Sequence, residues 1–124
     1  MAIGGLALAL AQQEKPQQTP PQEPPEEDAT DRPKEYALNP LQAVKEFNIG
    51  NYYLKKGSLK AAAGRYEEAT RWNPTFGDAY LKWAEVLERL RQQDKARDVY
   101  GKFLEMAPDH KRAVEIKRKL GKKA

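Results

Sequence analysis

The sequence predicts an all-α protein, a short solenoid of two tandem helical hairpins and a C-terminal capping helix, preceded by a proline-rich arm. One observation is an order of residue types that returns 34 positions further on: Ala62, Tyr66, Ala69, Pro74 and then Ala96, Tyr100, Phe103, Pro108. A second is that apolar residues recur every three or four positions between these markers, which is helical spacing. Strand-like alternation is absent. A fixed period of this size is typical of repeat architectures.

Composition excludes several kinds of chemistry. The chain has 124 residues, enough for one small domain and a tail, and it has no cysteine. Disulfides, thiolate nucleophiles and cysteine-based metal sites are therefore excluded. The single histidine, His110, cannot build a zinc site or a catalytic dyad alone. The net charge is +4, with seven acids and three bases in residues 12–35 against two acids and seven bases in residues 109–124.

Residues 1–11 form an uncharged, largely apolar run that ends in Ala9-Leu10-Ala11. A short apolar run followed by small residues at alternate positions is typical of a secretory signal peptide, although the positive n-region is missing. We interpret it as a truncated signal with a mature start near Gln12. The alternative is a short apolar N-terminus. The run is shorter than the roughly 20 apolar residues that span a bilayer.

Residues 12–39 are rich in proline, glutamine and acids and poor in large apolar side chains. Such a segment buries too little surface to offset its ordering entropy, so we expect a disordered linker with extended polyproline stretches. We favour a spacer. The alternative is that the stretch TPPQEPP is a ligand for a domain that binds polyproline segments.

The first two helices follow from end signals and apolar spacing. Asn39 and Pro40 supply an N-cap and a proline in the first turn, and Lys56-Gly57 ends the helix. Apolar or aromatic residues recur within it at Leu41, Val44, Phe47, Ile49, Tyr52 and Tyr53. We expect Ser58 to cap the second helix, whose inner stripe is Ala62, Tyr66 and Ala69, and Asn73-Pro74 to stop it.

Three further helices are expected. The third spans Phe76 to about Leu90 with Asp78 in its first turn, and the fourth spans about Gln93 to Met106 before Pro108. The last is a cap helix over residues 110–120, which carries Ala113, Ile116 and Leu120 on one side. A basic tail of residues 122–124 follows. These elements make up a domain of residues 40–121.

The repeated residues resemble the tetratricopeptide repeat, whose period is 34 residues and whose pattern is W-x2-L-G-x2-Y, A-x3-F, P. Repeat one is residues 43–76 and repeat two is residues 77–110. Matches are Ile49-Gly50, Tyr53, Ala62, Tyr66, Ala69 and Pro74, and then Tyr80, Trp83-Ala84, Leu87, Ala96, Tyr100 and Pro108. We expect Gly50 to face Ala62, Glu46 to lie on an exposed edge, and Phe103 to make a looser contact with the final helix.

Function is expected on the concave face, which the resemblance assigns to the first helix of each repeat. The residues expected there are, in repeat one, Val44, Phe47, Asn48, Asn51, Leu54 and Lys55, and in repeat two, Asp78, Leu81, Lys82, Glu85, Glu88 and Arg89. Chaperone-binding repeats use Lys and Asn on this face to bind a terminal carboxylate. Phe47 and Lys82 replace two of those residues, so we exclude that clamp. The face suits a protein or peptide partner, and the alternative is an ordinary solvated helix face.

Other features favour structural interpretations. The basic C-terminal helix has no interleaved aromatic residue, so we favour a solvated cap over a nucleic-acid or lipid site. Trp83 is expected in the core and Trp72 partly exposed. No catalytic motif is present, so we expect no enzyme, no cofactor, no metal and no small-molecule substrate. Because about three repeats are usually needed for stability, we expect marginal stability or self-association through the uncapped first hairpin.

The stretch from Phe47 to Pro74 also resembles the opening repeat of the outer-membrane β-barrel assembly lipoproteins. That resemblance implies a scaffold in envelope assembly. Our first hypothesis is an exported, non-catalytic adaptor that binds a protein partner in its concave groove. The alternatives are a cytoplasmic oligomerisation module and a binder of anionic membranes or nucleic acid through residues 111–123.

Overall fold

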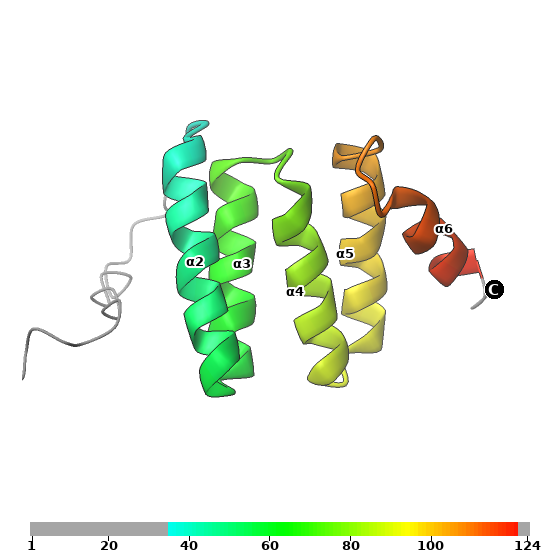
Figure 1. The fold of residues 1–124 in the computed structure, drawn as a ribbon, viewed down its shortest axis with the longest axis horizontal. Helices are drawn as coiled ribbons and strands as arrows, with labels where there is room; N and C mark the ends of the chain where they lie inside the picture. Colours follow the sequence, from blue (N-terminus) through cyan, green and yellow to red (C-terminus); the bar gives the residue numbers. More distant parts are fainter. Residues whose placement is uncertain (1–34, 122–124) are drawn as a thin grey trace, which may run out of the picture. The chain divides into compact units, whose positions relative to one another are not determined.

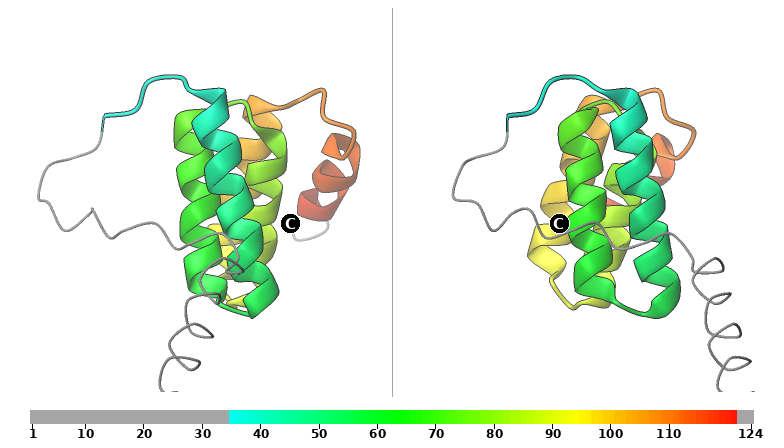
Figure 2. Two further views of the ribbon diagram at one scale, coloured as in Figure 1. Left: turned by 60° about the vertical axis from the view of Figure 1, so that its left-hand side comes forward. Right: turned by 90° about the vertical axis from the view of Figure 1, so that its left-hand side faces the viewer.

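The computed structural model describes residues 35–121, and the expectations for residues 1–34 and 122–124 lie outside them. The described part contains five α-helices: α2 (Pro40–Lys56), α3 (Leu59–Trp72), α4 (Gly77–Arg89), α5 (Gln93–Met106) and α6 (Ala113–Gly121). Helices α2 to α5 lie side by side in chain order, and the shorter α6 is tilted beside α5 (Figure 1). Helices α2 and α4 form one layer and α3 and α5 the other (Figure 2). The all-α hairpin architecture is confirmed.

The helix ends follow the predicted signals with two exceptions. Asn39 accepts a hydrogen bond of 3.1 Å from the backbone N–H of Gln42 through its side chain, and Gly57 ends α2 in the left-handed conformation at φ 82°. Ser58 precedes α3 but its side chain does not cap the helix. The last helix begins at Ala113, later than expected, because residues 108–112 form turns.

The core lies between the two layers and depends on aromatic residues at equivalent positions of the two repeats. The largest fully buried side chains are Tyr66, Tyr100, Phe103, Ile116 and Val86. The expectation of a loose contact at Phe103 is wrong. Its side chain is 0% exposed and packs edge-on against the ring of His110, with ring centres 5.1 Å apart.

Gly50 packs against the ring of Tyr66, and the contact with Ala62 stays a prediction. A methyl group added at Gly50 would lie 2.7 Å from Cε1 of Tyr66, closer than real carbon atoms approach. The glycine therefore makes room for an aromatic ring of α3, and the hairpin packs closely for that reason.

Glu46 is buried, which corrects the predicted exposed edge. Only 7% of the residue is exposed, and its carboxylate accepts hydrogen bonds from Arg65 of α3 at 3.1 Å and from Gln42 at 3.0 Å. Burial of a carboxylate is tolerated here because both of its oxygens have a donor. The position that usually holds a large apolar side chain therefore holds an ion pair.

The packed domain begins before Pro40. The ring of Tyr36 lies edge-on to that of Trp72, with centres 4.9 Å apart, and its hydroxyl donates to Glu68 at 2.6 Å. Trp72 is half-buried and Trp83 is buried, as predicted. Within residues 35–121, the ring partner of Trp72 is Tyr36.

The stripe of α2 that is equivalent to a buried stripe of α4 is partly exposed and includes a lysine. In α4 this stripe contains Ala79, Trp83 and Val86, all buried. The residues 34 positions earlier are Lys45, Ile49 and Tyr52, of which Lys45 is exposed and the other two are partly exposed. Lysine here disfavours stacking of another apolar helix, so self-association through this hairpin stays a prediction. No helix in the described range is long and apolar enough to cross a membrane.

Candidate functional site: the concave face

The concave face is the side of α2 and α4 on which the predicted site residues repeat at 34-residue spacing. The structure divides the twelve residues by exposure. Val44, Asn48, Lys55, Asp78 and Arg89 are exposed, whereas Phe47, Asn51, Leu54, Lys82, Glu85 and Glu88 are partly buried and Leu81 is buried. Three of the five exposed members therefore lie on α2.

Phe47 and Asn51 are engaged within the domain. The ring of Phe47 packs against Tyr66 at 5.5 Å and against Phe76, the residue before α4, at 5.0 Å between ring centres. Asn51 accepts a hydrogen bond from the hydroxyl of Tyr66. These two residues therefore connect α2 to α3 and to the residue that precedes α4, within the first repeat.

A chain of polar groups crosses the face from α2 to α6. Its first members are Asn51 and the buried Tyr66, whose pKa is raised to about 12 by burial and by the negative charge of Glu85. Glu85 of α4 in turn accepts a hydrogen bond from Arg112 at 3.1 Å, and Arg112 also binds Glu115 at 2.7 Å. The hydrogen bonds to both glutamates raise the pKa of Arg112, so it stays charged.

The acids of α4 are paired with bases of the C-terminal segment. Asp78 contacts His110 at 2.7 Å, Glu85 contacts Arg112 at 3.1 Å, and Glu88 contacts Lys119 at 2.9 Å. The sequence analysis missed this arrangement. The signal was there, since three acids on one side of α4 precede a strongly basic segment in a protein with short connections.

Much of the free part of the face lies on α2. Val44 is 45% exposed, and Leu41 and Leu38 beside it are 80% and 72% exposed. Asn48 and Lys55 continue the exposed side along the same helix. This side offers apolar contacts at the start of α2, an amide in the middle and a positive charge at the end.

The described side chains of the face form ion pairs and hydrogen bonds with one another. Among the described residues, no three histidine, aspartate or glutamate side chains are grouped so that they could hold a metal ion. The two shifted groups of the face, Tyr66 and Arg112, are shifted away from neutral pH and so are poor proton carriers there.

Comparison with known families decides the identity of the repeat. The model described as tetratricopeptide repeat matches residues 47–76 and 77–110, which together cover more than half of the chain. This chain belongs to the tetratricopeptide repeat family. No curated protein matches the sequence. The second matched segment has the bounds predicted for repeat two, and the first ends at residue 76 as predicted but begins at residue 47 instead of residue 43.

Membership explains the general character of the site. Tetratricopeptide repeat domains are typically non-catalytic scaffolds that bind other proteins. The match identifies the repeat and does not single out the outer-membrane assembly lipoproteins, so a role in the envelope belongs to the proposals below.

Proposed function

We propose that this tetratricopeptide protein is a non-catalytic adaptor that binds a segment of a partner protein along the exposed side of α2. The observation that carries this proposal is the asymmetry of the concave face. The acids of α4 contact His110, Arg112 and Lys119, whereas Val44, Asn48 and Lys55 on α2 are exposed.

The chemistry of that side defines the class of partner. Apolar side chains of the partner fit against Leu41 and Val44, an acidic group fits Lys55, and a backbone or side-chain amide fits Asn48. An amphipathic helix or an extended segment with apolar and acidic residues presents these groups in one row.

We also propose that the adaptor works in the bacterial envelope. Two features of the sequence support this setting: the apolar run that ends at Ala11, and the resemblance of residues 47–74 to the outer-membrane assembly lipoproteins. Mass spectrometry of the protein from cells tests the setting. A mature N-terminus near Gln12 supports export, and a chain that starts at Met1 contradicts it.

The binding site is tested by in-cell crosslinking and capture. The test variant carries Val44→Ser, Asn48→Ala and Lys55→Ala, which change exposed groups and leave Phe47 and Asn51 in place to support Tyr66. The matched control carries Lys45→Ala and Lys56→Ala on another exposed side of the same helix. We expect a defined protein partner with the native chain and the control, and its loss with the test variant. Equal capture by all three contradicts the proposed site.

A further inference from the structure

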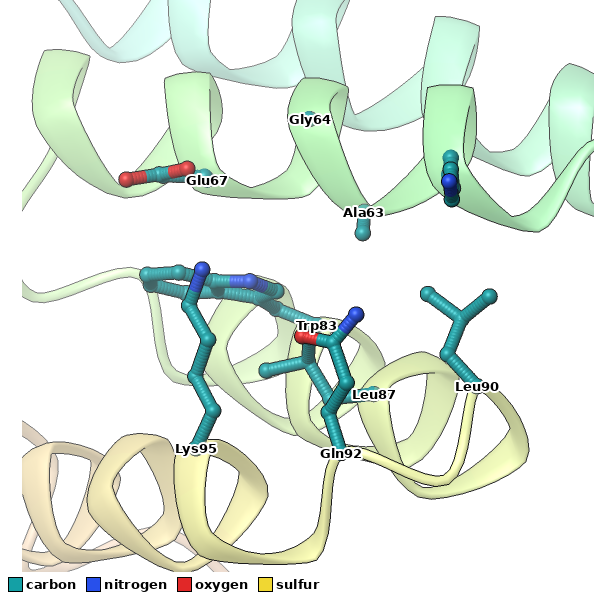
Figure 3. A pocket seen from close by; sticks show the side chains of 9 residues that line it. Ala63, Gly64, Glu67, Trp83, Leu87, Leu90, Gln92 and Lys95 are labelled. Carbon is teal, nitrogen blue, oxygen red and sulfur yellow. The ribbon is translucent and has the colours of Figure 1, made fainter.

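A hollow of about 220 Å³ lies between α3, α4 and the start of α5. Ala63 and Gly64 of α3 lie on one side of it, Gln92 and Lys95 of α5 lie on the other, and Trp83 of α4 lies between them (Figure 3). The lining is completed by Lys60, Glu67, Leu87 and Leu90. None of these residues belongs to the α2 surface to which the function proposed above assigns a partner.

The size of the hollow suits one large apolar side chain. Its volume is below the roughly 300–1,000 Å³ of most small-molecule sites. A methyl group added at Gly64 would meet nothing within 4 Å, so the wall on α3 is open. Trp83 and Leu87 are buried and Leu90 is partly buried, so the floor is apolar. Single aromatic or aliphatic side chains that fill a pocket of this kind often contribute most of the binding energy of a protein interface.

The hollow also offers a hydrogen-bond donor. Within residues 35–121, the indole N–H of Trp83 has no hydrogen-bond partner, and it is not enclosed, unlike the indole N–H of Trp72. An indole N–H only donates, so its partner must be an oxygen such as a backbone carbonyl. The side-chain amide of Gln92 beside it can donate or accept. These two groups suit the backbone of a peptide.

The charges around the hollow favour an acidic ligand. Lys60 on α3 and Lys95 on α5 both line it, and neither pairs with an acid among the residues that the structure describes. The one carboxylate of the lining, Glu67, is paired with Arg71 at 2.9 Å, which offsets its charge. The two free cations therefore lie on opposite walls of an apolar hollow.

The positive, open wall on α3 is not a general feature of the repeat. The residues 34 positions after Lys60 and Gly64 are Asp94 and Asp98. The lysine and the glycine are therefore replaced by two acids in the second repeat, whereas the buried packing positions keep their residue types. Packing of the helices does not explain the lining of this hollow.

We propose that this hollow is a second binding site, which takes an acidic segment of a partner protein. One large apolar side chain of that segment lies over Trp83, and carboxylates on either side of it lie at Lys60 and Lys95. Because the two lysines come from different walls, a segment with acids on both sides of the apolar residue is favoured over one with acids on one side. The site does not overlap with α2, so one chain can hold two partners.

NMR titration of the isotope-labelled full chain with two synthetic peptides tests the proposal. One probe is a blocked pentapeptide with phenylalanine between two pairs of glutamates, and the other has lysines in place of the glutamates. With the glutamate peptide we expect shifts of the indole N–H signal of Trp83 and of the amide signals of Gly64 and Lys95. The indole N–H of Trp72 is the internal control and should not shift. No shift at Trp83 up to millimolar peptide, or equal shifts with both peptides, overturns the proposal.

Two sets of variants identify the contact. Gly64→Leu fills the hollow at an open helix position and should abolish binding at Trp83, whereas Gly101→Leu adds the same side chain at another open position and should not. Lys60→Glu with Lys95→Glu should weaken binding of the glutamate peptide about tenfold or more and should favour the lysine peptide instead. Circular dichroism verifies that each variant is helical. Binding that survives both Gly64→Leu and the charge reversal contradicts the site.

Phenylacetate separates a peptide site from a small-molecule site, because it carries the same ring but only one carboxylate. We expect it to bind more weakly than the glutamate peptide, since it can reach only one of the two lysines. Equal affinity of the two probes would show a small-molecule site and would overturn the proposal. The signals of Trp83 and Gly64 do not depend on whether a partner binds α2, so this test and the capture experiment can fail separately.

Discussion

The carboxylate of Glu46 and the guanidinium of Arg65 form an ion pair of 3.1 Å that joins α2 to α3. The side chains are 9% and 26% exposed, so Glu46 is nearly excluded from water and Arg65 is not. In the second repeat the position of Glu46 is held by Tyr80, which is also buried. The two hairpins therefore use different chemistry at one equivalent position.

Removing Arg65 should cost more than removing both members of the pair. Arg65→Met leaves the carboxylate of Glu46 buried with one hydrogen-bond donor. We expect the free energy of unfolding to fall by about 2 kcal/mol. This is less than the loss for a fully buried ion pair, because Arg65 is partly exposed to water. The double variant with Glu46→Leu should recover most of that loss. Urea unfolding of both variants measures this. A double variant less stable than Arg65→Met would contradict the account.

Gly50→Ala should destabilise the domain although alanine favours helices. The new methyl group would lie 2.7 Å from the ring of Tyr66, and relieving this clash should cost about 1–3 kcal/mol. Gly64→Ala is the control, because its methyl group meets no atom and should stabilise α3 by about 0.5–1 kcal/mol. Thermal unfolding should separate the two variants in opposite directions from the native chain.

Arg91→Gly should stabilise the turn between α4 and α5. Arg91 has φ 66°, a left-handed conformation that costs a residue with a side chain about 1 kcal/mol. The equivalent residue 34 positions earlier is Gly57, with φ 82°. In both turns the following N–H donates 2.9 Å to the carbonyl five residues back, so the backbone already suits glycine. We expect the free energy of unfolding to rise by less than about 1 kcal/mol, because glycine also increases the conformational entropy of the unfolded chain. A lower melting temperature than that of the native chain would contradict this.

Stability should fall as the pH rises above about 10. Burial raises the pKa of Tyr66 and of Tyr100 to about 12, from an ordinary value of 10.0. Between these values the unfolded chain loses the phenol proton and the folded chain keeps it, so unfolding becomes easier. Lys119 has a raised pKa and contributes in the same direction. Tyr66→Phe with Tyr100→Phe should weaken the pH dependence of the free energy of unfolding between pH 10 and 12, and an unchanged slope would count against this origin.

The helices were predictable because their signals are local. Pro40, Gly57 and Asn73 mark helix ends through backbone geometry, and the predicted range of Gln93 to Met106 agrees with α5. The equivalence of the two repeats was also predictable from the sequence. Tyr66 and Tyr100, which lie 34 positions apart, are both fully buried.

The errors concern contacts that depend on a partner elsewhere in the chain. From the sequence alone, Glu46 was predicted to be exposed, because its ion pair with Arg65 of α3 could not be seen. Phe103 was predicted to make a loose contact, because its packing beside Gly77 and His110 depends on the folded chain. In the site, the acids of α4 and the basic C-terminal segment were visible in the sequence, but the pairing of Arg112 with Glu85 depends on how that segment folds back on α4. The free part of the concave face is therefore smaller than the predicted set of residues.

Lys45 on the partly exposed stripe of α2 also affects how this array can change in length. A duplicated copy of residues 77–110 brings an apolar stripe, with Ala79, Trp83 and Val86, that can pack on a helix before it. A duplicated copy of residues 43–76 brings Lys45 to the same buried position, where its charge would lack water. Insertions that copy the second repeat should therefore be tolerated more readily than copies of the first.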